Sequence, residues 1–366
     1  MRLEWRHINL CRAALAARLG GSNDKYRINN QMDMERSGGN VSLIRRVNLV
    51  FRFSYTLPFF MASVCGSLFA LLFYEPPIHV VVLMPLVALL LAVFVNFSND
   101  YFDHRSGVDR IRFSEKEEMM KAMDSEFMKK IYWEGNPFDD GLVTDRQGRV
   151  AMAALVCAAA LLAIPIMLHG GWVVVVFGAA GVFLSYFYTA PPLDLGARGL
   201  GEADVAVSFF MLVFCSFYVA TVDFDMGTFA TAGVFDTELF VFAVMVGTLV
   251  GLMRLTDSMS GQDAHIANGE RSISVRFGLD GAVRIAKALI VLAYAMAAAM
   301  AVMNPVYLLL FLTLPLMLKA CRVMDERGAQ WCLRAAPFFF GAAFLTELLF
   351  VAAIAVKYAF DVGSLL

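Results

Sequence analysis

Charged side chains are scarce in this chain of 366 residues. Asp, Glu, Lys and Arg together make up 17% of it and hydrophobic residues 59%, and the mean hydropathy is +0.65. Because soluble proteins carry about 25% charged residues, this composition excludes an ordinary soluble fold and indicates an integral membrane protein. A surplus of basic residues is missing too, since 30 Lys and Arg stand against 32 Asp and Glu. We therefore expect no nucleic-acid partner.

Metal-binding cysteine spacings and a secretory signal are also absent. The six cysteines are scattered without any CxxC pair, which argues against zinc-finger-like sites. The first 45 residues are polar and show no apolar stretch next to a small-residue cleavage site, so no cleaved signal is expected. We predict that residues 1–45 form a polar cytoplasmic N-terminal tail.

Long apolar runs dominate the remainder of the chain. A helix needs about 20 mostly apolar residues to cross the hydrocarbon core of a bilayer, and nine segments meet or approach this length. The sequence therefore predicts an all-α integral membrane fold, a bundle of nine transmembrane helices at Tyr55–Tyr74, Ile78–Ser98, Val150–Leu168, Trp172–Tyr188, Val205–Val222, Leu239–Leu255, Ala282–Met303, Pro305–Ala320 and Pro337–Tyr358.

The basic residues predict the orientation of this bundle. Lys and Arg lie almost entirely in the connections on one side, with Lys357 as the exception, whereas the connections on the other side contain none: 75–77, 169–171, 223–238 and 304–305. Positive residues in short loops stay on the cytoplasmic side. We expect a multi-pass protein of the cytoplasmic membrane, with its N-terminus and its long loops in the cytoplasm.

Two acidic clusters lie at the predicted cytoplasmic ends of the second and sixth spans. In the first, Asn99 and Asp103 are four residues apart and share one face of a helix. Asp109 follows beyond Gly107, a residue that lets the chain break and fold back. The second cluster contains Asp257 and Asp263. Oxygen ligands gathered without Lys partners suit Mg²⁺ and a substrate phosphate, although acidic residues at one helix end alone often just face water.

Three segments carry a family resemblance. Residues 99–109 read NDYFDHRSGVD and match an NDYxDxxxGxD pattern, residues 188–202 match YTxxPxxLGxxGLGE, and residues 269–278 read GERSISVRFG, similar to GKRTLxVRLG. These segments resemble the UbiA-type intramembrane prenyltransferases, and within that family the menaquinone-type branch. The resemblance covers about residues 46–360.

The resemblance implies a nine-helix prenyltransferase domain and its chemistry. The expected reaction is Mg²⁺-dependent transfer of a polyprenyl group from a polyprenyl diphosphate to a small aromatic acceptor, such as a dihydroxynaphthoate, in isoprenoid quinone biosynthesis, with the lipid tail between helices. The implied metal ligands are Asn99, Asp103, Asp109, Asp257 and Asp263. Implied catalytic residues are Asp103, Asp257, Arg198 and Arg271, and implied substrate-binding residues are Arg52, Asn99, Tyr188, Arg198 and Arg271.

The chain departs from the family pattern at three places. The second family motif is usually DxxxD, but Gly261 stands four residues after Asp257, so Asp263 could serve as a ligand only if the helix opens near Gly261. Pro192 stands where the family often has a Lys, which leaves the three arginines to contact the diphosphate. An extended cytoplasmic loop at 110–145 carries an amphipathic pattern over 119–131, typical of a helix on the membrane surface or of a lid over the site.

Other readings remain open at this point. A UbiA-type transferase with another acceptor, such as a glycerol-phosphate lipid, a haem or a chlorophyll precursor, would use the same acidic clusters. A secondary transporter would place its charges near the membrane midplane, whereas this chain has its acids at cytoplasmic helix ends, with Glu347 near the middle of the ninth span as the exception. A membrane-bound regulator that keeps the fold but has lost activity is a further alternative. Glu202 and Asp204, at the start of the fifth span, favour a helix N-terminus, and His265 is expected to be a polar surface residue.

Overall fold

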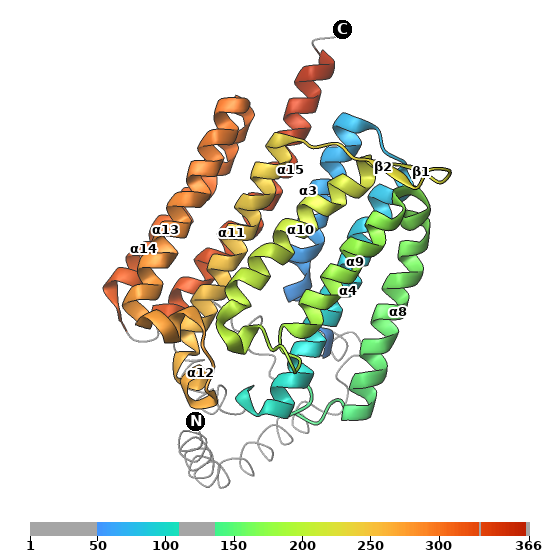
Figure 1. The fold of residues 1–366 in the computed structure, drawn as a ribbon. Helices are drawn as coiled ribbons and strands as arrows, with labels where there is room; N and C mark the ends of the chain where they lie inside the picture. The colour runs from blue at the N-terminus through green and yellow to red at the C-terminus, as the bar shows by residue number, and fades with distance from the viewer. Residues whose placement is uncertain (1–49, 110–135, 329–330, 364–366) are drawn as a thin grey trace, which may run out of the picture.

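The computed structural model describes residues 50–109, 136–328 and 331–363. The predicted 1–45 tail and the amphipathic pattern at 119–131 lie outside these residues. The described part is a bundle of long helices with one short hairpin (Figure 1). The long helices are α3 (Phe53–Tyr74), α4 (Ile78–Ser106), α8 (Asp145–Gly170), α9 (Trp172–Phe187), α10 (Gly201–Thr221), α11 (Thr237–Ser260), α13 (Ile273–Met303), α14 (Leu314–Glu326) and α15 (Trp331–Gly363).

Short elements connect these helices. The π-helical turn η1 (Gly196–Leu200) precedes α10, the antiparallel strands β1 (Asp223–Asp225) and β2 (Ala230–Ala232) lie between α10 and α11, α12 (Gln262–Asn268) follows α11, and the 3₁₀ helix η2 (Pro305–Thr313) leads into α14.

The all-α membrane fold predicted from the sequence is confirmed. Within the described residues, eight helical segments are long and apolar enough to cross a membrane. The predicted eighth span is one of them, because η2 and α14 join into a segment of 22 residues. The predicted fourth span corresponds to α9, which has only 16 residues and is shorter than such a segment. The count of nine transmembrane helices therefore stays a prediction.

Turn and cap residues set the ends of the helices. Thr144 and Gln147 form a capping box that starts α8, and the side chain of Asp236 accepts a hydrogen bond from the backbone N–H of Leu239 at the start of α11. These caps satisfy backbone donors that the first turn of a helix leaves free. Gly107, with φ of 78°, ends α4, as the sequence predicted.

Glycines allow α10 to pack closely against two neighbours. A methyl group at Gly247 of α11 would lie 2.4 Å from the carbonyl oxygen of Ala206, and one at Gly66 of α3 would lie 2.0 Å from the carbonyl oxygen of Val213. Small residues that let helix backbones approach are the usual means of packing in membrane bundles. The position of α10 is thus fixed between α3 and α11.

The two ends of the bundle differ in chemistry. At the end with the β1–β2 hairpin and the end of α15 (Figure 1), Lys357 is paired with Glu238 at 2.7 Å, and Tyr307 also donates to that carboxylate. The end of α4 and the helix α12 lie at the opposite end (Figure 1). That second end carries the acidic clusters found in the sequence.

We expect Gly247→Ala to destabilise the bundle, because the new methyl group meets backbone that cannot move aside without separating α10 from α11. Overpacking of this kind costs about 1–3 kcal/mol. Gly178→Ala in α9 is the matched control, since no atom lies within 4 Å of the added methyl group. Thermal unfolding of both purified variants in detergent measures the difference, and equal melting temperatures would contradict the close packing described here.

Candidate functional site

A cavity of about 440 Å³ lies at the acidic end of the bundle. Residues from α3, α4, α10, α11, α12 and α15 line it, together with the segment between α9 and α10. Along α4 the lining residues recur at helical spacing, from Val95 and Asn96 through Asn99 to Phe102 and Asp103. One face of each helix end is therefore turned toward the same space.

The first acidic cluster is built by the last turns of α4. Asn99 donates from Nδ2 to Oδ2 of Asp103 at 2.7 Å, as their four-residue spacing predicted. The chain turns at Gly107 and returns Asp109 to the cavity lining. There the side-chain amide of Asn136 donates hydrogen bonds to Asp109 Oδ2 at 2.8 Å and to the backbone carbonyl oxygen of Asp100. The structure thus brings Asn99, Asp103 and Asp109 to one cavity.

The second cluster lies at the end of α11. Asp257 lines the cavity, and its Oδ2 is 2.7 Å from Nη1 of Arg254. Arg254 also donates from Nε to the hydroxyl of Tyr188, at the end of α9. This arginine joins the segment after α9 to the acidic end of α11. Its role was missed from the sequence, where it was only one basic residue among several flanking the span.

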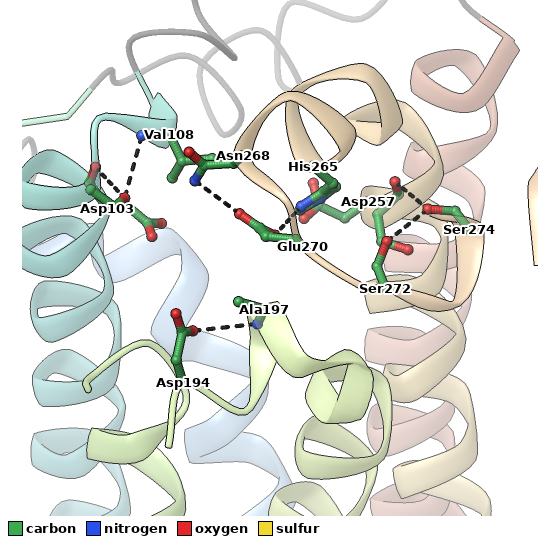
Figure 2. Close-up of polar contacts among 12 residues, drawn as sticks. Asp103, Val108, Asp194, Ala197, Asp257, His265, Asn268, Glu270, Ser272 and Ser274 are labelled. Atoms are coloured by element: carbon green, nitrogen blue, oxygen red, sulfur yellow. Dashed lines mark hydrogen bonds and ion pairs between the residues drawn. The ribbon is translucent and has the colours of Figure 1, made fainter. Parts of the chain in front are cut away.

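The two clusters face the same space. Asp103 and Asp257 both lie near enough to the Tyr188 hydroxyl to act on it electrostatically. Figure 2 shows Glu270 between the Asp103 and Asp257 sides of the site, with Asp194 below it on the segment that precedes η1. The carboxylates of Asp194 and Glu270 are close enough to repel each other. The structure therefore brings residues of both motifs to one cavity, and their joint role stays a prediction.

Three residues proposed from the sequence lie outside the cavity lining. Arg198 is exposed and donates from Nη2 to the carbonyl oxygen of Pro192 at 2.8 Å. Arg271 is exposed, and Asp263 is exposed on α12. For Asp263 the cause is local. The helix α11 ends before Gly261, and α12 runs in a new direction that turns Asp263 away from the cavity. Direct roles for these three side chains stay predictions.

Two other arginines lie in the cavity lining. Among the described residues, the arginines that line the cavity are Arg52 and Arg254. Arg52 was a sequence candidate, and its Nη2 lies 3.1 Å from Oδ1 of Asp100. Each arginine is thus paired with one aspartate at a helix end.

Glu270 and His265 form a polar pair that sequence reasoning missed. Glu270 bonds to Nδ1 of His265 and accepts from Asn268 Nδ2 at 3.3 Å (Figure 2). Burial alone raises the pKa of Glu270, but His265 and Asn268 outweigh it and the pKa is lowered. The expectation of a surface His265 is wrong, because the residue is only 7% exposed. The sequence did contain a signal for this pair, because Glu270 is the acidic residue of the GERSISVRFG segment at 269–278.

The donor set of the cavity fits Mg²⁺. The acidic residues that line the cavity outnumber its two arginines, and they are Asp103, Asp109, Asp194, Asp204, Asp257 and Glu270. Within the described residues no three His, Cys, Asp or Glu side chains gather closely enough to hold a metal by themselves. Mg²⁺ sites need only one or two carboxylates when waters and substrate phosphates supply the other oxygens. The arrangement therefore suits a metal that binds together with a phosphate ligand.

Comparisons by sequence and by structure both find UbiA-type proteins. The model of the UbiA prenyltransferase family matches residues 57–344. A 1,4-dihydroxy-2-naphthoate octaprenyltransferase of Bacillus subtilis (strain 168) is 20% identical over 238 residues, which cover 64% of this chain and 67% of the relative. A UbiA homologue from Archaeoglobus fulgidus bound to DMAPP and Mg²⁺ superposes with a TM-score of 0.57 at 15% identity, over 84% of this chain and 99% of the other.

A second solved structure shares the same fold. It concerns digeranylgeranylglyceryl phosphate synthase, with a TM-score of 0.55 at 14% identity, over 85% of this chain and 98% of the other. At these identities the structural likeness shows the fold alone.

The surroundings of Asp194 lead us to expect that the stability of the fold depends on pH. Burial raises its pKa, the nearby Glu270 adds to this, and the hydrogen bond from the Ala197 N–H opposes it. A raised pKa means that the charged form is disfavoured in the folded state, so the charge destabilises the fold once the pH exceeds the unfolded value of about 3.9. Asp194 also has a φ of 44°, which Asn tolerates well.

We expect Asp194→Asn to raise the melting temperature, and to raise it more at neutral pH than near pH 4 (an approximate lower limit set by the unfolded Asp). Melting curves of both proteins across this range, without ligand, measure the effect. A gain that shrinks as the pH rises would contradict the assigned direction.

Proposed function

The chain belongs to the UbiA prenyltransferase family, and from this premise we propose that it transfers a polyprenyl group from a polyprenyl diphosphate to a dihydroxynaphthoate-like aromatic acceptor, in a Mg²⁺-dependent step of isoprenoid quinone biosynthesis. One observation carries the proposal. The acid-rich lining of the cavity continues along the same helix faces into apolar lining, so a single space suits both a diphosphate and its lipid tail.

The helix faces divide the substrate between two surroundings. On α11 the lining runs from Gly261 and Asp257 back to Met253 and Val250. The diphosphate group belongs at the polar end of this row, and the prenyl chain belongs along its apolar end, where burial of each CH₂ is worth about 0.8 kcal/mol. The neighbouring lining of α3 supplies Pro58 and Phe59 to the same apolar part.

Arg52 and Arg254 would bind the diphosphate oxygens. Ionisation of an allylic diphosphate breaks its C–O bond and leaves the bonding electrons on the departing diphosphate. Donors already aimed at that developing charge favour the step. Arg254 is held for this purpose by Asp257 and Tyr188, and Arg52 is held by Asp100.

The carboxylates give the site its need for a divalent cation. Asn99, Asp103 and Asp109 on one side, and Asp257 with Glu270 on the other, would hold Mg²⁺, which supplies Lewis-acid stabilisation of the leaving diphosphate. Glu270 takes this role on the second side, where the sequence offered Asp263. Without such cations the surplus of carboxylates would repel an anionic substrate.

The acceptor completes the reaction. A ring carbon of the electron-rich aromatic attacks the allylic carbon and forms the new C–C bond, and a naphthoate would lose its carboxylate as carbon dioxide. The name of the Bacillus subtilis relative supports this acceptor class. The surrounding apolar lining would exclude water, which would otherwise capture the allylic cation.

The basic residues at the cavity end support the proposed location. By the positive-inside rule, they support a location of the cavity and the N-terminus on the cytoplasmic side of the cytoplasmic membrane. Other UbiA-type acceptors remain outcomes of the acceptor test. Transport is disfavoured because the acids that line the cavity lie at helix ends and in the adjoining segments, and among the described acids Glu347 in the middle of α15 is the exception.

We expect Asp103→Asn to lower Mg²⁺-dependent prenyl transfer at least about 100-fold, because it removes a charged metal ligand. The measurement uses detergent-purified protein, a labelled polyprenyl diphosphate and a panel of aromatic and lipid acceptors. Asp223→Asn is the matched control, since this exposed aspartate lies in β1 at the opposite end of the bundle. Full activity of Asp103→Asn, or transfer in the presence of a chelator, would contradict the proposal.

The positions of the arginines lead to a second expectation. Arg254→Gln should weaken binding of inorganic diphosphate with Mg²⁺ by about 10- to 100-fold, as expected for a lost charge-assisted hydrogen bond. Arg198→Gln should change it little, because Arg198 is exposed and bonded to Pro192. Isothermal titration calorimetry compares the two variants. If Arg198→Gln weakens diphosphate binding more than Arg254→Gln does, the result would contradict this assignment and support Arg198, the residue predicted from the sequence.

A further inference from the structure

Asp204 is an acidic residue of the cavity without an assigned task. It lies in the first turns of α10, lines the cavity, and is only 8% exposed. In the part of the chain that the structure describes, its Oδ1 is buried and has no hydrogen-bond partner. Buried carboxyl oxygens are nearly always bonded, so this oxygen lacks a donor that a bound ligand could supply.

The neighbouring Glu202 shows what a structural acid looks like in the same turn. Its Oε1 accepts from the Ser258 hydroxyl at 3.0 Å and from the backbone N–H of Ile273 at 3.2 Å. Glu202 therefore joins α10 to α11 and to the start of α13, and it does not line the cavity. A structural role therefore accounts for the position of Glu202, but it does not account for the position of Asp204 in the cavity lining.

The surroundings of Asp204 are aromatic and weakly polar. Ser208, one turn further along α10, lines the cavity on the same face, with Phe209 beside it. Phe59 of α3 and Phe340 of α15 belong to the same lining. Aromatic side chains pack well against a flat ring, and a carboxylate among them accepts hydrogen bonds from hydroxyl groups.

We propose that Asp204 binds the acceptor, by accepting a hydrogen bond from a ring hydroxyl of a hydroxylated aromatic. This inference rests on the proposed function and adds a residue that selects the acceptor. A prenyl chain has no donor to offer, and the oxygens of a diphosphate are acceptors that reach a carboxylate only through a cation. A hydroxylated aromatic ring supplies both the O–H donor and the flat apolar surface.

The test measures binding of two probes to the detergent-purified full chain, namely 1,4-dihydroxy-2-naphthoate and its 1,4-dimethoxy counterpart. The wild type should bind the hydroxylated probe about 10- to 100-fold more tightly, the usual worth of a hydrogen bond to a charged group. Asp204→Leu should reduce this preference to less than about threefold, within the scatter expected for non-bonded changes. Asp204→Asn, which keeps the size of the side chain and one acceptor oxygen, should give an intermediate preference.

Glu202→Gln is the matched control from the same turn. It should lower the melting temperature and leave the preference for the hydroxylated probe unchanged, whereas Asp204→Asn should not lower the melting temperature. Binding of a polyprenyl diphosphate with Mg²⁺ is measured in parallel and should be the same in the wild type and in both Asp204 variants.

The outcomes separate the two claims. A wild type that binds no polyprenyl diphosphate contradicts the proposed function itself. Normal diphosphate binding, together with no preference in the wild type or an unchanged preference in Asp204→Leu, contradicts the role of Asp204 alone. A loss of diphosphate binding in Asp204→Asn would also overturn it, because that result would make Asp204 part of the diphosphate site.

Discussion

Compensation of negative charge is the constraint on which this site depends. Among the residues that the structure describes, six carboxylates and two arginines line one cavity at the end of an apolar bundle. Arg254 is paired with Asp257 and Arg52 with Asp100. The carboxylates of this lining outnumber its arginines, so the site gathers negative charge that divalent cations would neutralise. In the proposed reaction, a diphosphate would bind together with those cations.

The packing of the bundle keeps the charged groups in register. Acids are costly inside hydrocarbon, and Asp103 and Asp257 lie in the last turns of α4 and α11. Gly247 and Gly66 let α10 lie against α11 and α3, which fixes the apolar lining relative to the acidic end. Arg254 then ties the end of α9 to α11 through Tyr188. The result is a polar site that continues directly into apolar cavity lining.

The sequence predicted those features that depend on local spacing. Apolar runs located the membrane helices, and the interval between Asn99 and Asp103 predicted their shared face, which the hydrogen bond between them bears out. Gly107 predicted the turn that returns Asp109 to the cavity. Family motifs placed Tyr188 correctly in the lining. Each of these conclusions depends on residues only a few positions apart.

Features that depend on the path of irregular segments could not be predicted in this way. The turn at Gly261 directs Asp263 outward, and the π-helical turn before α10 leaves Arg198 exposed. Glu270 and Asp194 come from two connections 76 residues apart in number, and only the fold brings them near one another.

The most direct test of a single cavity for diphosphate and lipid is a crystal structure of the protein with a non-reactive prenyl thiodiphosphate and Mn²⁺, whose anomalous scattering locates the metal. The account predicts the diphosphate between the ends of α4 and α11, in contact with Arg254, with Mn²⁺ between it and the carboxylates and the prenyl chain along α3 and α11. A diphosphate bound at the exposed Arg198 or Arg271, with the cavity free of metal, would contradict it.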